Sequence, residues 1–202
     1  MFVGIDVGAR RLDAAAVNLD GVVIDVAAFD ASDASAAAAW CRGADVVAID
    51  APQRLSDAPH ANDVGLAPKF RTARCAEIDL GRRHRLWVPW TTPTADAPLP
   101  GWMASGMALF AALQGAIEVF PYAAFHVLAG ARLAPKQTPA GRAARARLLG
   151  LPLDRHSHHV LDALIAARTA RDHALGQAVA VTCGHDGSAI WLPVVAEDLH
   201  RT

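Results

Sequence analysis

Three acidic residues interrupt or end short apolar runs that otherwise have the composition of buried β-strands. Asp6 ends the first run and is followed by Gly8, Asp50 ends a second run, and Glu118 lies within a third. The runs are Met1-Phe-Val-Gly-Ile-Asp-Val, Asp45-Val-Val-Ala-Ile-Asp and Ala116-Ile-Glu-Val-Phe-Pro. A carboxylate in apolar surroundings needs a cation or several hydrogen-bond donors to stay charged. The pattern therefore indicates metal binding by the acids or phosphate binding by a glycine turn, although a strand acid can also simply cap the next turn.

A fourth acid, Asp162, borders the apolar side of a helix predicted over residues 157–175. It follows His158 and His159 by about one helical turn. These histidines lack cysteines or other ligands at zinc spacing, so we do not expect a structural zinc site here. An acid at the edge of a buried helix face needs a partner, as the strand acids do.

Basic residues near the middle of the chain allow two interpretations each. Arg74 and Glu77 are three residues apart on a predicted short helix and share a face, as a surface ion pair or as an arm that reaches the acids. The basic run at 82–85 precedes Trp87 and Trp90. Such mixing suits phosphate contacts and base stacking, but it is equally typical of a solvated face.

A later basic segment, residues 132–150, contains no acid to balance its charge. Lys136 lies before a predicted helix, on which Arg142 and Arg145 share one face. This segment is the best candidate for binding backbone phosphates. The alternative is that its arginines solvate a peripheral helix.

The predicted elements bring two of the acids to one edge of a sheet. The first three strands form a meander, because Asp20-Gly21 between two β-prone runs predicts a hairpin. A helix over residues 33–40 then leads to the strand that ends at Asp50, which should run parallel to the first strand. Ligand sites in such sheets gather at the carboxyl ends of parallel strands, so Asp6 and Asp50 should be neighbours there.

The remainder of the chain alternates between loops and apolar elements. We expect a single domain over residues 1–202, with a helical and loop insertion around 53–115. Further predicted elements are a buried helix over 102–114, a strand over 116–121 and two closing strands over 178–182 and 189–192.

Composition excludes several classes of protein. Hydrophobic residues make up 53% of the chain, mean hydropathy is +0.22 and the net charge is −1, which argues against disorder and against a general polycation. The uncharged stretch 97–117 contains prolines and glycines, so we expect a buried helix there rather than a membrane span.

The cysteines and the start of the sequence indicate the compartment. The three cysteines form no CxxC pair and leave one unpaired in any disulfide scheme. No basic region precedes the first apolar run. We therefore expect a cytoplasmic protein without a signal peptide.

The order of these motifs resembles a known family. Acids at successive strand ends and on a late helix are similar to the ribonuclease H-like fold, and more closely to the predicted nucleases of domain of unknown function 429. The matching segments are Gly4-Ile-Asp6, Ala48-Ile-Asp50-Ala-Pro52, Arg71 to Glu77, Ile117-Glu118-Val-Phe-Pro121, Leu161-Asp162-Ala-Leu-Ile-Ala-Ala-Arg-Thr-Ala170, and Asp186-Gly187 with Ile190-Trp-Leu-Pro193. The resemblance implies an α/β fold with a ribonuclease H-like mixed five-stranded sheet flanked by helices.

The resemblance also implies a metal-dependent nuclease whose carboxylates bind Mg²⁺ or Mn²⁺ and whose substrate is DNA or RNA. The implied catalytic and metal-binding residues are Asp6, Asp50, Glu118 and Asp162. Asp6 would bridge two ions, Asp50 and Glu118 would hold one ion each, and Asp162 would complete the second site. Histidines 158 and 159 stand where the family pattern has a further acid, and His159 is an additional candidate because histidine can ligate Mn²⁺.

Substrate-binding residues implied by the same reasoning are Lys136, Arg142, Arg145 and Arg74, with Lys136 or Arg142 placing the scissile phosphate. Two other functions share parts of this pattern. An actin-like phosphotransferase or ATPase has a similar opening strand but needs a second phosphate loop, for which 202 residues leave little room. A non-catalytic module that binds nucleic acid or protein is the other alternative.

Overall fold

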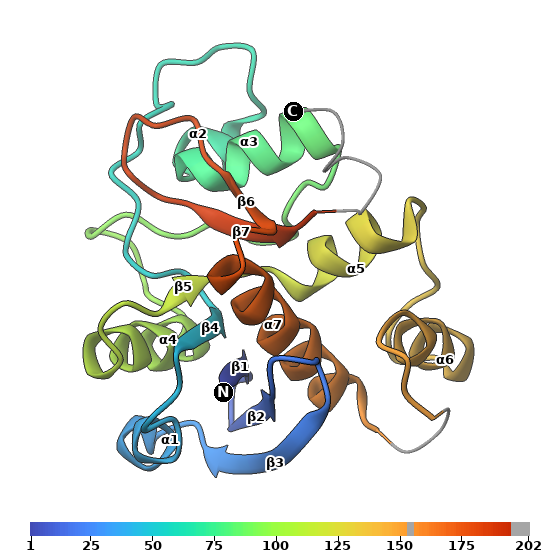
Figure 1. Cartoon of the computed structure of the whole chain (residues 1–202). Coiled ribbons are helices and arrows are strands. Elements are labelled where there is room, and N and C mark those ends of the chain that lie inside the picture. Colours follow the sequence, from blue (N-terminus) through green and yellow to red (C-terminus); the bar gives the residue numbers. More distant parts are fainter. Residues whose placement is uncertain (153–155, 195–202) are drawn as a thin grey trace.

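Five strands form a mixed sheet in the computed structural model, which describes residues 1–152 and 156–194 (Figure 1). The strand order is β3-β2-β1-β4-β5. The strands are β1 (Phe2–Val7), β2 (Arg11–Val17), β3 (Val23–Asp30), β4 (Val46–Asp50) and β5 (Ile117–Glu118). The first three are antiparallel, whereas β4 runs parallel to β1 and β5 runs parallel to β4. This is the predicted ribonuclease H-like sheet.

The hairpin predicted at Asp20-Gly21 joins β2 to β3. Its conformation is set by Asn18, whose side-chain oxygen accepts hydrogen bonds from the backbone N–H groups of Asp20 and Val22. Gly21 has a φ of +80°, a conformation that glycine adopts without the steric cost that a Cβ would bring. Local residues therefore favour this turn, and Arg171 of the last helix adds a hydrogen bond to the Leu19 carbonyl oxygen.

Helices cover both faces of the sheet. On one face, α1 (Ala34–Trp40) and α4 (Gly101–Ala112) pack on Val3 and Ile5. On the other face, α7 (His158–Ala174) crosses β1 so closely that a Cβ at Gly4 would come within 2.2 Å of the Ala163 carbonyl oxygen. Gly4 is therefore required for α7 to approach the centre of the sheet.

A second layer lies beyond the β5 edge of the sheet (Figure 1). It consists of α2 (Pro68–Arg71), α3 (Cys75–His84), α5 (Pro121–Ala129) and the antiparallel hairpin β6 (Ala178–Val181) and β7 (Ile190–Pro193). A single bridge between Val119 and Trp191 connects this hairpin to the end of β5. The two closing strands were predicted, whereas α5 was not, because Pro121 was read only as the end of a strand. Proline is also favoured in the first turn of a helix, which is its position in α5.

The remaining helix, α6 (Pro139–Leu148), lies beside α5 and α7. Within residues 1–152 and 156–194, no helix is both long and apolar enough to cross a lipid bilayer. The uncharged stretch 97–117 contains α4, whose Met103 and Leu109 are buried in the core.

Candidate functional site

The pairing register places three acids on one face of the sheet. Asp6 lies opposite Asp13 on β2 and beside Asp50 on β4. Side chains alternate along a strand, and Phe2 and Ala48 both pack in the cluster that faces α7. Asp6 and Asp50, an even number of residues further on, must therefore leave the sheet toward α7 as well. The two acids are neighbours at the carboxyl ends of parallel strands, as predicted.

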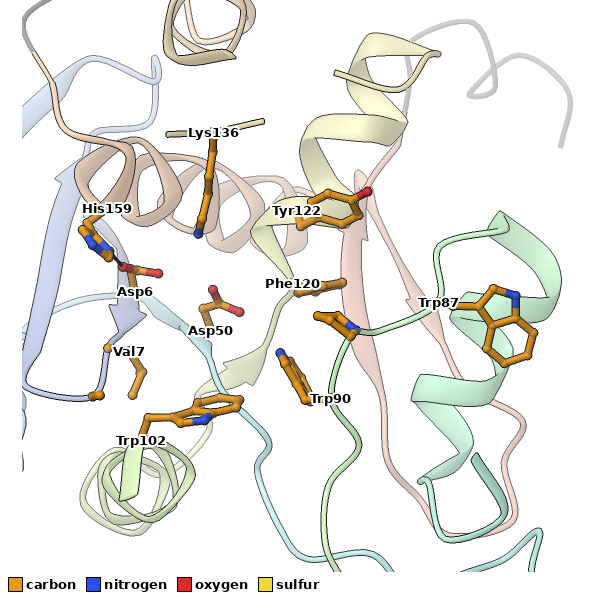
Figure 2. A pocket seen from close by; sticks show the side chains of 13 residues that line it. Asp6, Val7, Asp50, Trp87, Trp90, Trp102, Phe120, Tyr122, Lys136 and His159 are labelled. Carbon is orange, nitrogen blue, oxygen red and sulfur yellow. Dashed lines mark hydrogen bonds and ion pairs between the residues drawn. The ribbon is translucent and has the colours of Figure 1, made fainter. Parts of the chain in front are cut away.

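Asp6 is 5% exposed and is held by a residue of α7. The Nδ1 atom of His159 lies 2.7 Å from the Asp6 Oδ2 atom and donates a hydrogen bond to it (Figure 2). This bond raises the pKa of His159 above its ordinary value, in spite of partial burial. His159 thus lies at the site, and its ring bears positive charge more readily than a free histidine does.

Asp13 belongs to the same group, although the sequence analysis did not identify it. Its carboxylate is buried and accepts hydrogen bonds from the Arg11 Nε and Nη2 atoms at 3.1 and 2.8 Å. Asp6, Asp13 and His159 offer ligand atoms that all lie within 4.8 Å of one another. The available signal was an acid within the second apolar run, on the strand that follows Asp6 in the predicted meander.

The pKa of Asp50 is shifted by the crowding of these acids. Burial raises the pKa of Asp50 well above its usual range, and the nearby carboxylates of Asp6 and Asp162 raise it further. Closely spaced like charges disfavour simultaneous ionisation.

Asp162 projects from α7 and is only 1% exposed. One of its oxygens, Oδ2, accepts a hydrogen bond from the ammonium group of Lys136, whereas the other, Oδ1, is buried and has no partner among the described residues. Burial raises the pKa of Asp162 to about 6, although Lys136 opposes the shift. A buried carboxylate oxygen without a donor is costly, so this atom is suited to a cation that enters the site.

Lys136 reaches the acids from the loop before α6. Figure 2 shows its side chain extending toward Asp6 and Asp50. Burial alone would lower the pKa of Lys136, but the carboxylates of Asp162, Asp6 and Asp50 raise it above its ordinary value. Lys136, which was predicted to place the scissile phosphate, therefore lies beside the acids.

The donor set fits a hard divalent cation. The acids around Asp6 supply carboxylate oxygens, which Mg²⁺ and Mn²⁺ prefer, and His159 supplies a nitrogen that Mn²⁺ also accepts. The negative charge of these acids is only partly offset by Lys136, Arg11 and His159. The unpartnered Oδ1 atom of Asp162 is a further indication that a cation belongs here.

Glu118 was predicted to bind metal beside the other acids, but its carboxylate is engaged elsewhere. It lies in register with Ile49 rather than Asp50, so it leaves the sheet on the opposite face. The guanidinium of Arg74 donates two hydrogen bonds to its oxygens, at 2.6 and 2.7 Å, and the backbone N–H of Gln53 donates a third at 2.9 Å. Glu118 is near enough to contribute to the raised pKa of Asp50. It is nevertheless saturated with donors and is not an open ligand.

Arg74 was predicted to contact substrate, and the structure corrects this. It is 1% exposed and is bound by both Glu118 and Glu77. Glu77 is fully buried and also accepts hydrogen bonds from the backbone and hydroxyl groups of Thr92. Burial raises the pKa of Glu77, while Arg74 and Thr92 act against that rise. The pair Arg74–Glu77 was predicted correctly as a contact, but it is internal and neither on the surface nor in the site.

Arg145, another predicted substrate ligand, is also internal. It is 2% exposed, donates hydrogen bonds of 2.9 Å to the carbonyl oxygens of Ala134 and Gly141, and lies over the ring of Phe125. It therefore holds the loop that carries Lys136. Arg142 is partly exposed and donates to the Gln137 carbonyl oxygen at 2.7 Å, so it stays a candidate for phosphate contact.

A cavity of about 560 Å³ opens beside the acids. Its polar lining includes Asp6, Asp50, Lys136 and His159. Its apolar lining includes five aromatic residues: Trp87, Trp90, Trp102, Phe120 and Tyr122 (Figure 2). The sequence indicated two of these through the basic run before them, whereas the other three come from α4 and from the junction of β5 and α5.

These features define an α/β domain of ribonuclease H-like topology with an acidic site at the carboxyl ends of its central parallel strands. The family model described as "Protein of unknown function (DUF429)" matches residues 108–186, which confirms the resemblance over that segment. The matched segment includes Glu118, Lys136 and Asp162. No curated protein matches the chain.

Two solved structures are similar to this chain. A Thermus thermophilus RuvC structure has a TM-score of 0.47 and 17% sequence identity, over 94% of this chain and 98% of that chain. A structure of T. thermophilus RuvC in complex with a Holliday junction substrate has a TM-score of 0.45 and 16% identity, with the same coverage.

Proposed function

We propose that this protein is a metal-dependent nuclease that hydrolyses phosphodiester bonds of nucleic acids. The observation that carries the proposal is the position of Asp6 and Asp50, side by side on the face of the sheet that meets Asp162, whose Oδ1 atom is buried and unpartnered. Acids crowded in this way favour a divalent cation over mutual repulsion. The side chains that would hold Mg²⁺ or Mn²⁺ are Asp6, Asp50 and Asp162, with Asp13 and His159 adjacent.

Bound divalent ions would supply an activated water and charge stabilisation at the leaving oxygen. Asp6 lies between Asp13 and Asp50 in the sheet, so it is the acid best placed to bridge two ions. Glu118 has an indirect role in this scheme. Through Arg74 and the N–H of Gln53 it fixes the chain directly after Asp50.

Two cationic side chains of the site suit a phosphate substrate. The ammonium group of Lys136 would donate to a non-bridging phosphate oxygen in place of its present partner Asp162. His159 donates from Nδ1 to Asp6, and its side chain is 46% exposed. When His159 does not bind the cation, its protonated form carries a second proton on Nε2, which can pass to the leaving oxygen.

The aromatic half of the cavity favours a substrate with unpaired bases. Base–aromatic stacking contributes about 1–3 kcal/mol per base and needs a free π-face, which a fully stacked duplex does not offer. Tyr122 is 36% exposed and lines the cavity together with Trp90 and Phe120. We therefore propose that single-stranded or locally unpaired DNA or RNA is the preferred substrate.

The test is a cleavage assay with Mg²⁺ or Mn²⁺ on single- and double-stranded DNA and RNA. Asp6→Asn keeps the size of the side chain but replaces a charged oxygen with a donor that repels a cation. We expect its activity to fall by more than about a hundredfold, because changes to outer-shell partners alone reduce metal-site activity by 10–100-fold. The matched control is Asp25→Asn, at an exposed acid of β3, which should leave activity unchanged.

Three results would contradict the proposal. Equal cleavage by wild type and Asp6→Asn would assign the activity to a contaminant. No cleavage of any substrate, together with no thermal shift from Mn²⁺ or Mg²⁺, would favour a non-catalytic binding module. A thermal shift that required ATP would favour a phosphotransferase.

A further inference from the structure

Three potential metal ligands meet at a second place, away from the carboxylates of the proposed nuclease site. The Nε2 atom of His60 lies 3.6 Å from the Sγ atom of Cys75 and 3.5 Å from the Sγ atom of Cys183. The ligand atoms of the three residues all lie within 4.8 Å of one another. The residues come from distant parts of the chain, which is why the sequence showed no zinc-type spacing.

The two cysteines lie on neighbouring elements of the second layer. Cys75 is the first residue of α3, a ten-residue helix, and is fully buried. Cys183 follows β6, and the two Cα atoms are 5.1 Å apart. In the oxidised chain the two sulfur atoms form a disulfide.

We propose that, in the reduced chain, His60, Cys75 and Cys183 bind one thiophilic divalent cation of the zinc class. Zinc–sulfur distances of about 2.3 Å and zinc–nitrogen distances of about 2.0–2.1 Å, at a tetrahedral angle, separate the two ligand atoms by roughly 3.6 Å. The two nitrogen–sulfur distances have this value in the disulfide-bonded structure, and after reduction the two sulfur atoms would have to separate for the ion to bind. Two thiolates and one imidazole form a soft donor set, in contrast to the oxygen ligands around Asp6.

Metal binding at this site requires two steps, reduction of the disulfide and then release of the thiol protons. A phosphine or thiol reductant gives two electrons to the disulfide, and with two protons the sulfur atoms become thiols while the reductant is oxidised. The cation then binds as the two thiol protons are released, so its affinity should rise with pH. The fourth position of a tetrahedral ion is left to water, as at open zinc sites.

The bound ion would join three segments that hold the interior of the second layer. His60 lies in the loop before α2, Cys75 begins α3, and Cys183 lies in the β6–β7 hairpin. Cys75 directly follows Arg74, whose guanidinium binds Glu77 and Glu118. The ion is therefore expected to stabilise the fold around Arg74 without taking part in the chemistry at Asp6.

The experiment uses Co²⁺ as a spectroscopic substitute on the full chain, reduced with a phosphine and freed of metal by a chelator. We expect thiolate-to-cobalt charge-transfer absorption that saturates at one Co²⁺ per chain and is bleached by Zn²⁺. Cys183→Ser should lose most of this absorption, and His60→Asn should weaken the binding of Co²⁺ at least tenfold. Cys41→Ser should leave it unchanged, because Cys41 is a buried free cysteine in the core on the other face of the sheet.

Circular dichroism of each variant separates loss of the site from loss of the fold. No charge-transfer absorption in the reduced wild type would overturn the proposal and leave only a disulfide. Undiminished absorption in a folded Cys183→Ser variant would overturn it as well. Asp6→Asn should keep the absorption, so failure of the nuclease proposal and failure of this one are distinguishable.

Discussion

Two groups of buried acids lie near the end of the sheet, and they differ in how their carboxylate oxygens are hydrogen-bonded. Glu77 and Glu118 surround Arg74, and all four of their carboxylate oxygens accept hydrogen bonds. Around Asp6, by contrast, Asp6 and Asp50 line a cavity and the pKa of Asp50 is raised well above its usual range. Asp162 has a buried oxygen without a partner in the described part of the chain. Every carboxylate oxygen of the first group thus has a donor, whereas the second group keeps a buried oxygen that has none among the described residues.

The difference shows how buried acidic residues of one protein come to have structural or functional roles. A bidentate guanidinium satisfies two buried carboxylates and fixes their geometry, so the Arg74 group serves the fold. Carboxylates that stay crowded, buried and only partly neutralised reduce stability unless a ligand binds them. A site of this kind is what a metal-dependent enzyme requires, and its instability without metal is measurable.

The largest expected effect is a loss of stability in Arg74→Ala. Removing this cation leaves Glu77 and Glu118 as unpaired buried charges, which should lower the free energy of unfolding by roughly 3–5 kcal/mol. Asp6→Asn should keep or raise the free energy of unfolding in the absence of metal, since it relieves repulsion with Asp50 and Asp13. Urea denaturation of the metal-free proteins measures both. A loss in Asp6→Asn as large as that in Arg74→Ala would refute the distinction between the two groups.

A smaller effect should appear in the pH dependence of stability. Burial raises the pKa of Asp162 from 3.8 to about 6, so between these values the folded chain retains a proton that the unfolded chain releases. The free energy of unfolding of the metal-free protein should therefore fall as pH rises from about 4 to about 6, by up to roughly 3 kcal/mol. The raised pKa of Asp50 acts in the same direction.

Asp162→Asn is the matched variant for this measurement, because it removes the titrating group and retains its size. We expect its stability curve to be flatter than that of the wild type between pH 4 and 6. Saturating Mn²⁺ should also flatten the wild-type curve, since the cation binds the ionised form. Parallel curves for wild type and Asp162→Asn would assign the slope to other acids.

The sequence predicted the elements that local residues determine. It did not predict the position of side chains whose partners are distant in the chain. The hairpin at Asp20-Gly21 and the parallel strand ending at Asp50 followed from turn residues and apolar runs. Glu118 was misplaced because β5 is only two residues long, and a shift of one residue in register reverses the face of a side chain. No local pattern showed that Arg74 meets Glu118, 44 residues away.

Arg145 illustrates a related limit. A charged side chain on a predicted helix is normally assigned to the solvent, and helical spacing cannot show that a loop will fold over it. Gly141 allows that approach, because a Cβ there would lie 2.0 Å from the Pro135 carbonyl oxygen. The cluster of His60, Cys75 and Cys183 was missed for the same reason, since its members meet only in three dimensions.

The smallest expected effect concerns Arg142, at the edge of the acidic site. Its side chain is partly exposed, and within residues 1–152 and 156–194 its guanidinium donates only to the Gln137 carbonyl oxygen, so a phosphate can bind it without disturbing the core. Arg142→Ala should weaken binding of single-stranded nucleic acid by about 1 kcal/mol or less and reduce the slope of log affinity against log salt by about 1. The measurement is fluorescence anisotropy with catalytically impaired Asp6→Asn protein over a series of salt concentrations.

Arg42→Ala is the control. Arg42 lies between α1 and the start of β4, at the amino end of that strand and hence away from the acids at the carboxyl ends. Equal salt slopes for Arg142→Ala and its parent would show that the positive charge at Lys136, inside the site, binds the phosphate without help from α6.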